Sequence, residues 1–133
     1  MGCVSTRLAG GSSTSIEQAT LSVGDRQYQF DACRSGDREY FLGVDLASRR
    51  SAVSVRLVID AMEEPRLRVI LGEGGAKEGL ALGRDQCRQL EAQVRHTGWR
   101  INTVRDLSGF IDAECRDDEG QAISLHVRFS HCH

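Results

Sequence analysis

Apolar and polar residues alternate with a period of two along most of the chain after Ala19. In residues 53–59, for example, every second residue is Val, Leu or Ile. Because neighbouring side chains of a strand point to opposite faces of a sheet, this pattern predicts half-buried strands. The segments that carry it are 19–23, 27–32, 39–46, 53–60, 67–71, 107–115 and 123–129. The chain is therefore predicted to form a mainly β, antiparallel, sandwich-like domain of about seven strands.

One stretch, residues 85–97, departs from this alternation. Cys87, Leu90 and Val94 are spaced as on one face of a helix, Asp85 is a suitable N-cap, and Gly98 stands where a left-handed C-terminal glycine belongs. The pattern predicts one short amphipathic α-helix packed on the sheet, with the Cys87 sulfur directed at the core.

The last two strand segments predict a hairpin whose loop has an odd number of residues. Their apolar residues are all odd-numbered, so the apolar faces coincide only if paired residue numbers sum to an even value, such as 236 or 238. A three-residue loop with a left-handed Gly120 and a bulge satisfies this condition. A two-residue turn would instead bury Arg128 or His126.

Five cysteines divide into one at the N-terminus and four in the patterned body: Cys3, Cys33, Cys87, Cys115 and Cys132. Cys3 precedes a segment rich in Gly, Ser and Thr, so residues 1–17 are predicted to be a flexible spacer and residues 18–133 a single domain. No two cysteines have the C-x₂₋₄-C spacing of a zinc site. The division predicts an exported protein with two disulfides and a lipid on Cys3.

The predicted hairpin limits how the four body cysteines can pair. Cys132 lies about opposite residues 104–106, which is too far from Cys115 for a bridge. Two pairings stay open: Cys33–Cys132 with Cys87–Cys115, and Cys33–Cys115 with Cys87–Cys132. The first is favoured, because Cys115 lies on the core face where an inward-facing Cys87 can meet it.

Two chemistries could acylate Cys3. The start of the chain, MGCVST, matches the myristoylation pattern, with Cys3 available for palmitate. That would place the domain in a reducing cytosol, where disulfides are rare. Alternatively, Gly2-Cys3 is the end of a bacterial lipobox whose upstream signal has been removed. The four body cysteines, and the single Lys among 17 basic residues, favour the bacterial version. An untargeted cytosolic protein with five thiols is the third alternative.

The formal net charge is −2, with 17 basic and 19 acidic residues interspersed, so no nucleic-acid partner is expected. The sequence contains no run of 18 apolar residues, so no membrane-spanning helix is predicted.

Candidate chemistry is sparse. His126, His131 and His133 cluster near the C-terminus and are weak metal-ligand candidates with no third ligand evident. The Gly-rich stretch 71–75 lacks the ending of a phosphate-binding loop. The carboxylates of 63–64 and 117–119 fall in predicted turns, where solvated acids are ordinary. We therefore expect no catalytic residues, no cofactor and no enzymatic activity.

Aromatic residues are few, and Tyr28, Tyr40, Phe41 and Trp99 are expected in the core. An exposed Tyr40 or Trp99 would instead indicate a ligand-facing surface.

Three features resemble the mycobacterial 19 kDa lipoprotein antigens and related actinobacterial lipoproteins. They are Cys3 with its Ser/Thr/Gly spacer, the segment 21–33 (LSVGDRQYQFDAC), and a terminal hairpin that opens with 107–111 (LSGFI) and returns through 127–132 (VRFSHC). The resemblance implies a surface lipoprotein without enzymatic activity, and pairing of the early and terminal cysteines, here Cys33 and Cys132. This chain departs from the family in having Cys87, Cys115 and the predicted helix.

These expectations combine into a non-enzymatic exported lipoprotein, held by a lipid on the outer face of the cell membrane or in the periplasm. It is expected to bind a protein or an envelope component through its sheet surface or loops. The alternatives are a periplasmic inhibitor or immunity-type lipoprotein that inserts a loop, such as 72–80, into a hydrolase, and a metal-binding protein that uses the C-terminal histidines.

Overall fold

The computed structural model describes residues 14–72 and 79–133, and within them the chain forms ten strands in two five-stranded antiparallel sheets. Two 3₁₀ turns, η2 (Gly36–Glu39) and η4 (Arg84–Gln86), interrupt the strands, and these described segments contain no α-helix. Nor do they contain any helix with the length and apolarity that crossing a bilayer requires. The strands are β1 (Ser15–Val23), β2 (Arg26–Gln29), β3 (Ala32–Ser35), β4 (Gly43–Ser48), β5 (Val53–Ile59), β6 (Pro65–Leu71), β7 (Leu80–Leu82), β8 (Cys87–Ile101), β9 (Val104–Arg116) and β10 (Ala122–Cys132).

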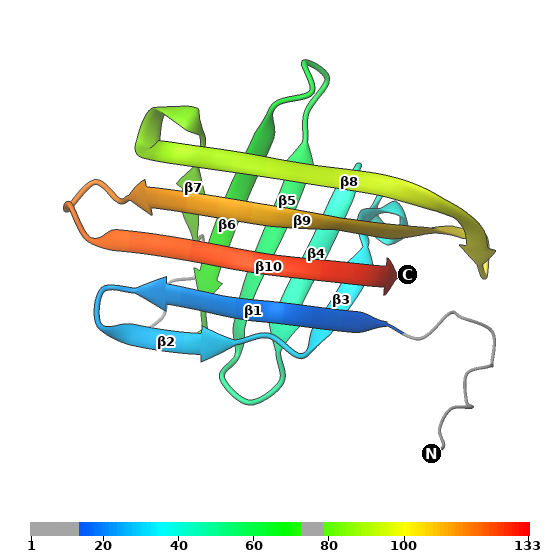
Figure 1. Cartoon of the computed structure of the whole chain (residues 1–133), viewed down its shortest axis with the longest axis horizontal. Coiled ribbons are helices and arrows are strands. Elements are labelled where there is room, and N and C mark those ends of the chain that lie inside the picture. The colour runs from blue at the N-terminus through cyan, green and yellow to red at the C-terminus, as the bar shows by residue number, and fades with distance from the viewer. Residues whose placement is uncertain (1–13, 73–78) are drawn as a thin grey trace.

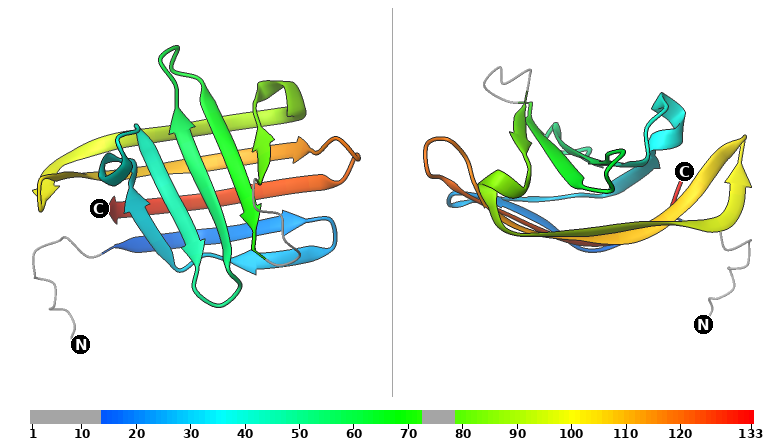
Figure 2. Two further views of the ribbon diagram at one scale, coloured as in Figure 1. Left: turned by 180° about the vertical axis from the view of Figure 1, so that it is seen from behind. Right: turned by 90° about the horizontal axis from the view of Figure 1, so that it is seen from above.

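The two sheets pack face to face, with their strands running crosswise (Figure 1). Sheet A has the strand order β2-β1-β10-β9-β8, and sheet B has the order β3-β4-β5-β6-β7. Figure 2 shows the two layers from above, with the curved sheet A enclosing the shorter strands of sheet B. The mainly β, sandwich-like class predicted from the alternation is therefore confirmed, with ten strands in place of about seven.

The core lies between the sheets and consists of the alternate residues that the pattern predicts. In β5, Val53, Val55 and Leu57 are buried, and in β10 the odd-numbered residues from Ile123 to Phe129 are buried. Since each strand contributes one apolar face, the outer faces of both sheets are polar.

Two predicted strands have different limits in the structure. The segment 27–32 divides between the sheets: the Phe30 N–H donates to the Ala19 carbonyl of β1, and the Asp31 N–H donates to the Ala47 carbonyl of β4. The segment 39–46 is extended only from Gly43, because η2 precedes it. β1 begins at Ser15, so the end of the predicted spacer belongs to sheet A.

The predicted helix at 85–97 is wrong, since these residues form η4 and the first part of β8. Leu90, Ala92 and Val94 face the core at a spacing of two. A bulge between Cys87 and Gln89 shifts the register, so that Cys87 also faces inward. A strand with a bulge thus reproduces the spacing of a helix face. Gly98, expected to end the helix, lies instead in a second irregularity, between His96 and Arg100.

The terminal hairpin has the predicted register. Ile123 pairs with Cys115 and Leu125 with Ala113, so paired numbers sum to 238. Gly120 is left-handed at φ 83°, and the Asp117 N–H donates to the Gln121 carbonyl, which leaves three residues between them. The Asp117 carboxylate accepts the N–H groups of Glu119 and Gln121 and thereby holds the turn.

The disulfides are Cys33–Cys132 and Cys87–Cys115, which is the favoured pairing. The first joins β3 of sheet B to β10 of sheet A, whereas the second joins neighbouring strands of sheet A. Cys132 lies opposite Leu107 and not opposite 104–106, because a bulge between Phe129 and Cys132 shifts the register and turns this even-numbered residue inward. Two disulfides indicate an extracytoplasmic protein.

Candidate functional site

Four large hydrophobic side chains are exposed on the described surface: Tyr40, Leu42, Met62 and Trp99. Tyr40 is 96% exposed and Trp99 is 55% exposed, so the expectation that they belong to the core is wrong for both. Tyr28 is partly buried against the core, as expected. Exposed aromatic and Met side chains are typical of binding surfaces.

The backbone of η2 explains why Tyr40 points outward. The Ser35 hydroxyl accepts the N–H of Asp37, and the Tyr40 N–H donates to the Asp37 carbonyl. Tyr40 itself is left-handed, with φ 67°. Its neighbour Phe41 is covered instead: its ring packs on Gly36, where a Cβ would lie 2.6 Å from a ring carbon. The turn thus covers one aromatic residue and exposes the next.

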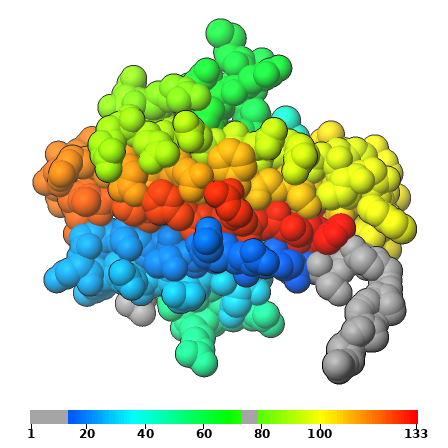
Figure 3. All heavy atoms as spheres, viewed as in Figure 1, coloured from blue at the N-terminus to red at the C-terminus, as the bar shows by residue number. Residues whose placement is uncertain are grey.

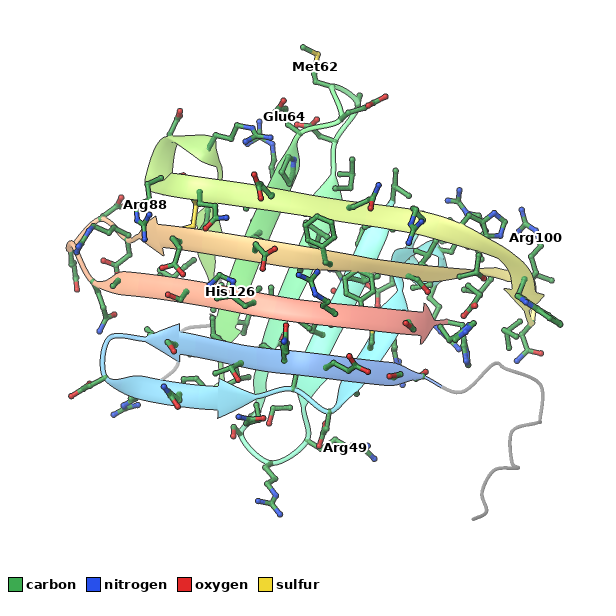
Figure 4. The ribbon with its side chains drawn as sticks, in the orientation of Figure 1. Arg49, Met62, Glu64, Arg88, Arg100 and His126 are labelled. Carbon is green, nitrogen blue, oxygen red and sulfur yellow. A yellow bond between two sulfur atoms is a disulfide. The ribbon has the colours of Figure 1, made fainter. Side chains whose placement is uncertain are left out.

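Met62 belongs to the turn between β5 and β6, which an aspartate organises. Asp60 accepts the N–H groups of Met62 and Glu64, each at 2.9 Å, and pairs with Arg66. The backbone hydrogen bond from Glu64, followed by the one from the Arg66 side chain, lowers the pKa of Asp60. Figure 4 shows Met62 at the tip of this turn.

Leu42 lies beside the same turn. The Leu42 carbonyl accepts the N–H of Ile59, the last residue of β5, so η2 and the β5–β6 turn meet at one end of sheet B. Tyr40, Leu42 and Met62 lie on or beside these two turns, and we name this end of the molecule the apolar end of sheet B.

An ion pair connects η2 to sheet A. Arg105 of β9 donates from its backbone N–H and from Nε to Asp37 Oδ2, at 2.9 and 3.0 Å, and from Nη2 to Asp37 Oδ1 at 2.8 Å. These hydrogen bonds lower the pKa of Asp37 to about 2, and those from the Arg105 side chain have the largest effect. The carboxylate is therefore ionised at any ordinary pH and holds η2 against β9.

The long hairpin of β8 and β9 carries Trp99. The hairpin is closed by the pair Ile101–Val104, and its two turn residues, Asn102 and Thr103, both have positive φ. At its base, a fully buried carboxylate joins three strands. Asp106 Oδ2 accepts the Thr97 hydroxyl and His131 Nδ1, each at 2.7 Å, whereas Oδ1 has no partner.

The outer face of sheet A faces the viewer in Figure 3, and His126 lies near the middle of this face (Figure 4). His126 Nδ1 lies 2.9 Å from Asp112 Oδ1, and Nε2 lies 2.6 Å from Glu114 Oε2. An ionised carboxylate only accepts hydrogen bonds, so this geometry favours the doubly protonated imidazolium. Accordingly, the hydrogen bonds to Asp112 and then to Glu114 raise the pKa of His126.

The three histidines proposed as metal ligands have different surroundings. His126 lies between carboxylates on the outer face, and His131 faces the buried Asp106. The described residues form no group of three or more His, Cys, Asp or Glu suited to a metal ion. The structure therefore does not gather His126, His131 and His133 into one site.

A depression of about 640 Å³ lies at the far end of β8 and β9 from the hairpin turn. It is lined by the Cys87–Cys115 disulfide together with Arg88, Arg116 and the acids of the 117–118 turn. Its sulfur atoms are bonded to each other, so it contains no thiol nucleophile. With Asp85 and Glu114, its lining has four acidic and two basic side chains, so the depression does not favour an anion.

Arginines gather on the outer face of sheet B, around a depression of about 440 Å³ lined by Arg56, Arg66 and Arg68. Arg56 pairs with Asp45 and Glu39. Its hydrogen bonds to these carboxylates raise the pKa of Arg56, and the bond to Asp45 has the larger effect. Arg66 pairs with Asp60. Since these charges are compensated locally, the face is not a ready-made anion site.

Two of the predicted features lie outside the described residues: Cys3 with its spacer up to residue 13, and residues 73–78 of the loop proposed for hydrolase inhibition. The exposed surface that the sequence analysis missed is the apolar end of sheet B. A signal was present in the adjacent aromatics Tyr40 and Phe41, because only one of two neighbouring side chains in an extended segment can face the core. The sequence does not say which of the two is covered.

Scans of protein-family models, of curated proteins and of solved structures each find no match to this chain. The resemblance to the mycobacterial antigens stays a prediction.

Proposed function

We propose that this chain is a non-enzymatic, extracytoplasmic binding domain, held at a membrane by an acyl group on Cys3. The observation that carries the proposal is the use of all four body cysteines in two disulfides. They leave Cys3 as the one cysteine without a partner in the chain. Its position ahead of a Gly/Ser/Thr-rich segment suits an acylated tether.

The apolar end of sheet B supports a binding role for the body. Tyr40, Leu42 and Met62 lie on or beside turns that Asp37 and Asp60 hold in place. Because these turns are already ordered, binding a partner should cost little conformational entropy. Rigid aromatic anchors account for much of the energy of protein interfaces, and Met is enriched in them. The expected partner is a protein or other component of the cell envelope.

The same geometry disfavours catalysis by the cysteines or histidines of the described residues. Both ring nitrogens of His126 face carboxylates, and His131 Nδ1 faces a buried one. A nucleophilic cysteine needs an accessible thiolate, which an oxidised pair does not supply.

The tether is tested on the protein isolated from the membranes of the cells that make it. We expect no titratable thiol in the denatured, unreduced protein. We also expect an intact mass that exceeds the mass of the chain by that of the acyl groups, and proteolysis should place this extra mass on the N-terminal peptide. One thiol with an unmodified mass would refute the anchor. Four or five thiols would refute the disulfides and export as well.

The binding surface is tested by Tyr40→Ser combined with Met62→Ser. Both side chains are exposed, so the fold should survive, as circular dichroism and thermal melting would verify. The partner is first captured by a photo-cross-linker placed at position 40 and is then purified. We expect its affinity for the double variant to be lower by about 30-fold or more, because loss of the Tyr40 anchor alone costs about 2 kcal/mol. The exposed Arg50→Glu in the β4–β5 turn serves as control. Equal affinity of all three proteins would refute the surface.

A further inference from the structure

The β8–β9 hairpin projects beyond the body of the domain at the end where the N-terminal segment leaves sheet A. Ile16 pairs with Phe129, Phe129 with Gly109, and Gly109 with Val94, so the start of β1 is level with Val94. The hairpin continues for seven further residues to Ile101. Figures 1 and 2 show it curving away from the other strands at this end.

The projecting segment, residues 95–105, has a charge unlike that of the whole chain. It contains three Arg and one His and no acidic residue, although the chain has a net charge of −2. Arg105 is engaged by Asp37, whereas Arg95 and Arg100 form no ion pair with any described residue. Between them lies Trp99, the only Trp of the chain and 55% exposed.

The hairpin is held in this position. At its base, Asp106 accepts hydrogen bonds from Thr97 of β8 and His131 of β10, and Arg105 is held by Asp37. The tip is therefore presented in one orientation, with little further ordering needed for binding.

A tethered Cys3 and the hairpin tip can reach the same surface. Ser15 follows Cys3 by 12 positions, a span of at most about 40 Å at 3.3–3.6 Å per residue. The hairpin projects about 20 Å past the start of β1, at about 3.3 Å per residue. The tail is thus long enough for its lipid to enter a bilayer that the tip touches.

We propose that the tip of the β8–β9 hairpin, with Trp99 and Arg100, docks on an anionic phospholipid surface. This proposal rests on the membrane tether proposed above and adds a second contact that orients the domain. Trp prefers the interface between headgroups and acyl chains, and basic side chains are attracted to anionic headgroups. A single acyl chain binds only weakly, so a second contact also lengthens residence on the membrane.

The test attaches the full chain to vesicles through Cys3, the one thiol, by a maleimide phospholipid. Vesicles of phosphatidylcholine with roughly 30% phosphatidylglycerol are compared with phosphatidylcholine alone. Because Trp99 is the only Trp, its emission reports the hairpin alone. We expect a shift to shorter wavelength and quenching by brominated lipid on the anionic vesicles, reversed by about 1 M salt.

The variant Arg100→Glu changes the charge by two units. At about fivefold per unit, it should lower the docking equilibrium constant about 25-fold. Arg50→Glu makes the same change in the β4–β5 turn and should leave docking unaltered. Trp99 emission that is unchanged on anionic vesicles, or equal for the two variants, would overturn the proposal and leave a protein partner as the occupant of the tip. Because the maleimide tether replaces natural acylation, this result is independent of whether cells acylate Cys3.

Discussion

At the scale of single residues, histidines facing carboxylates join neighbouring strands. His126 does this on the solvent-facing side of sheet A, where Arg88 and Arg128 also lie 4.0 Å from Glu114 and Asp112. His131 does it at the boundary of the core, where its side chain is 30% exposed and the Asp106 that it faces has no solvent exposure. The two sites should respond differently to substitution.

For His126, the expected effect is on the pH dependence of stability. Its folded pKa is raised above 6.5, so its contribution is complete below pH 6.5 and is lost as the pH rises through the raised pKa. We expect the thermal midpoint of the wild type to fall over this range relative to that of His126→Gln. Parallel pH profiles for the two proteins would contradict the assignment. The lowered pKa of Glu114 acts separately, since its contribution is present above 4.5 and is lost only in acid.

For His131, the expected effect is on stability itself. Replacing His131 with Asn, which tolerates its φ of 57°, removes the hydrogen-bond partner that His131 Nδ1 supplies to the buried Asp106. We expect unfolding in urea to show a loss of about 1–3 kcal/mol. Adding Asp106→Asn should then cost little more, because the hydrogen bond between the two side chains is already lost. Additive losses in this double-mutant cycle would show that the two side chains do not act as a pair.

At the scale of elements, β8 shows where period-based reasoning fails. Cys87, Leu90 and Val94 fit a helix face, but the alternation Leu90, Ala92, Val94 fits a strand equally well. A bulge adds the one residue that places Cys87 on the same face. Short segments often satisfy both periods, and only the neighbouring strand β9, which needs a partner, decides between them.

A single substitution in the turn of the β8–β9 hairpin should stabilise the hairpin. Thr103 is β-branched and has a φ of 67°, which favours glycine. We expect Thr103→Gly to stabilise the hairpin by about 0.5–1 kcal/mol. This figure is the backbone strain that glycine relieves, minus the conformational entropy that glycine adds to the unfolded chain. Slower amide exchange at residues 99–105 would show it. Thr103→Ala, which stays strained, is the control, and faster exchange in the Gly variant would contradict the prediction.

At the scale of the whole molecule, the two disulfides have different tasks. Cys33–Cys132 joins the two sheets across a separation of 99 residues, whereas Cys87–Cys115 joins neighbouring strands across 28. In the chain-entropy model, the longer loop stabilises the domain more.

Removing each disulfide should therefore rank them. We expect Cys33→Ala with Cys132→Ala to cost about 4.7 kcal/mol, and Cys87→Ala with Cys115→Ala about 3.6 kcal/mol. Alanine avoids burying a hydroxyl at Cys132. Urea unfolding with each remaining disulfide intact measures both losses. A larger loss for the Cys87–Cys115 pair would contradict the ranking.

The sequence by itself determined the local features of this protein. Strand alternation, the odd-length loop at Gly120 and the even pairing sum follow from which residues must face a core, and these depend on near neighbours in the chain. Tertiary structure alone decided what depends on distant partners: that segment 27–32 divides between two sheets, that β8 is a strand, and that a bulge turns Cys132 inward to Cys33. It also decided that Tyr40 and Trp99 are exposed, because burial depends on whether another part of the chain covers a side chain, and no local period records that.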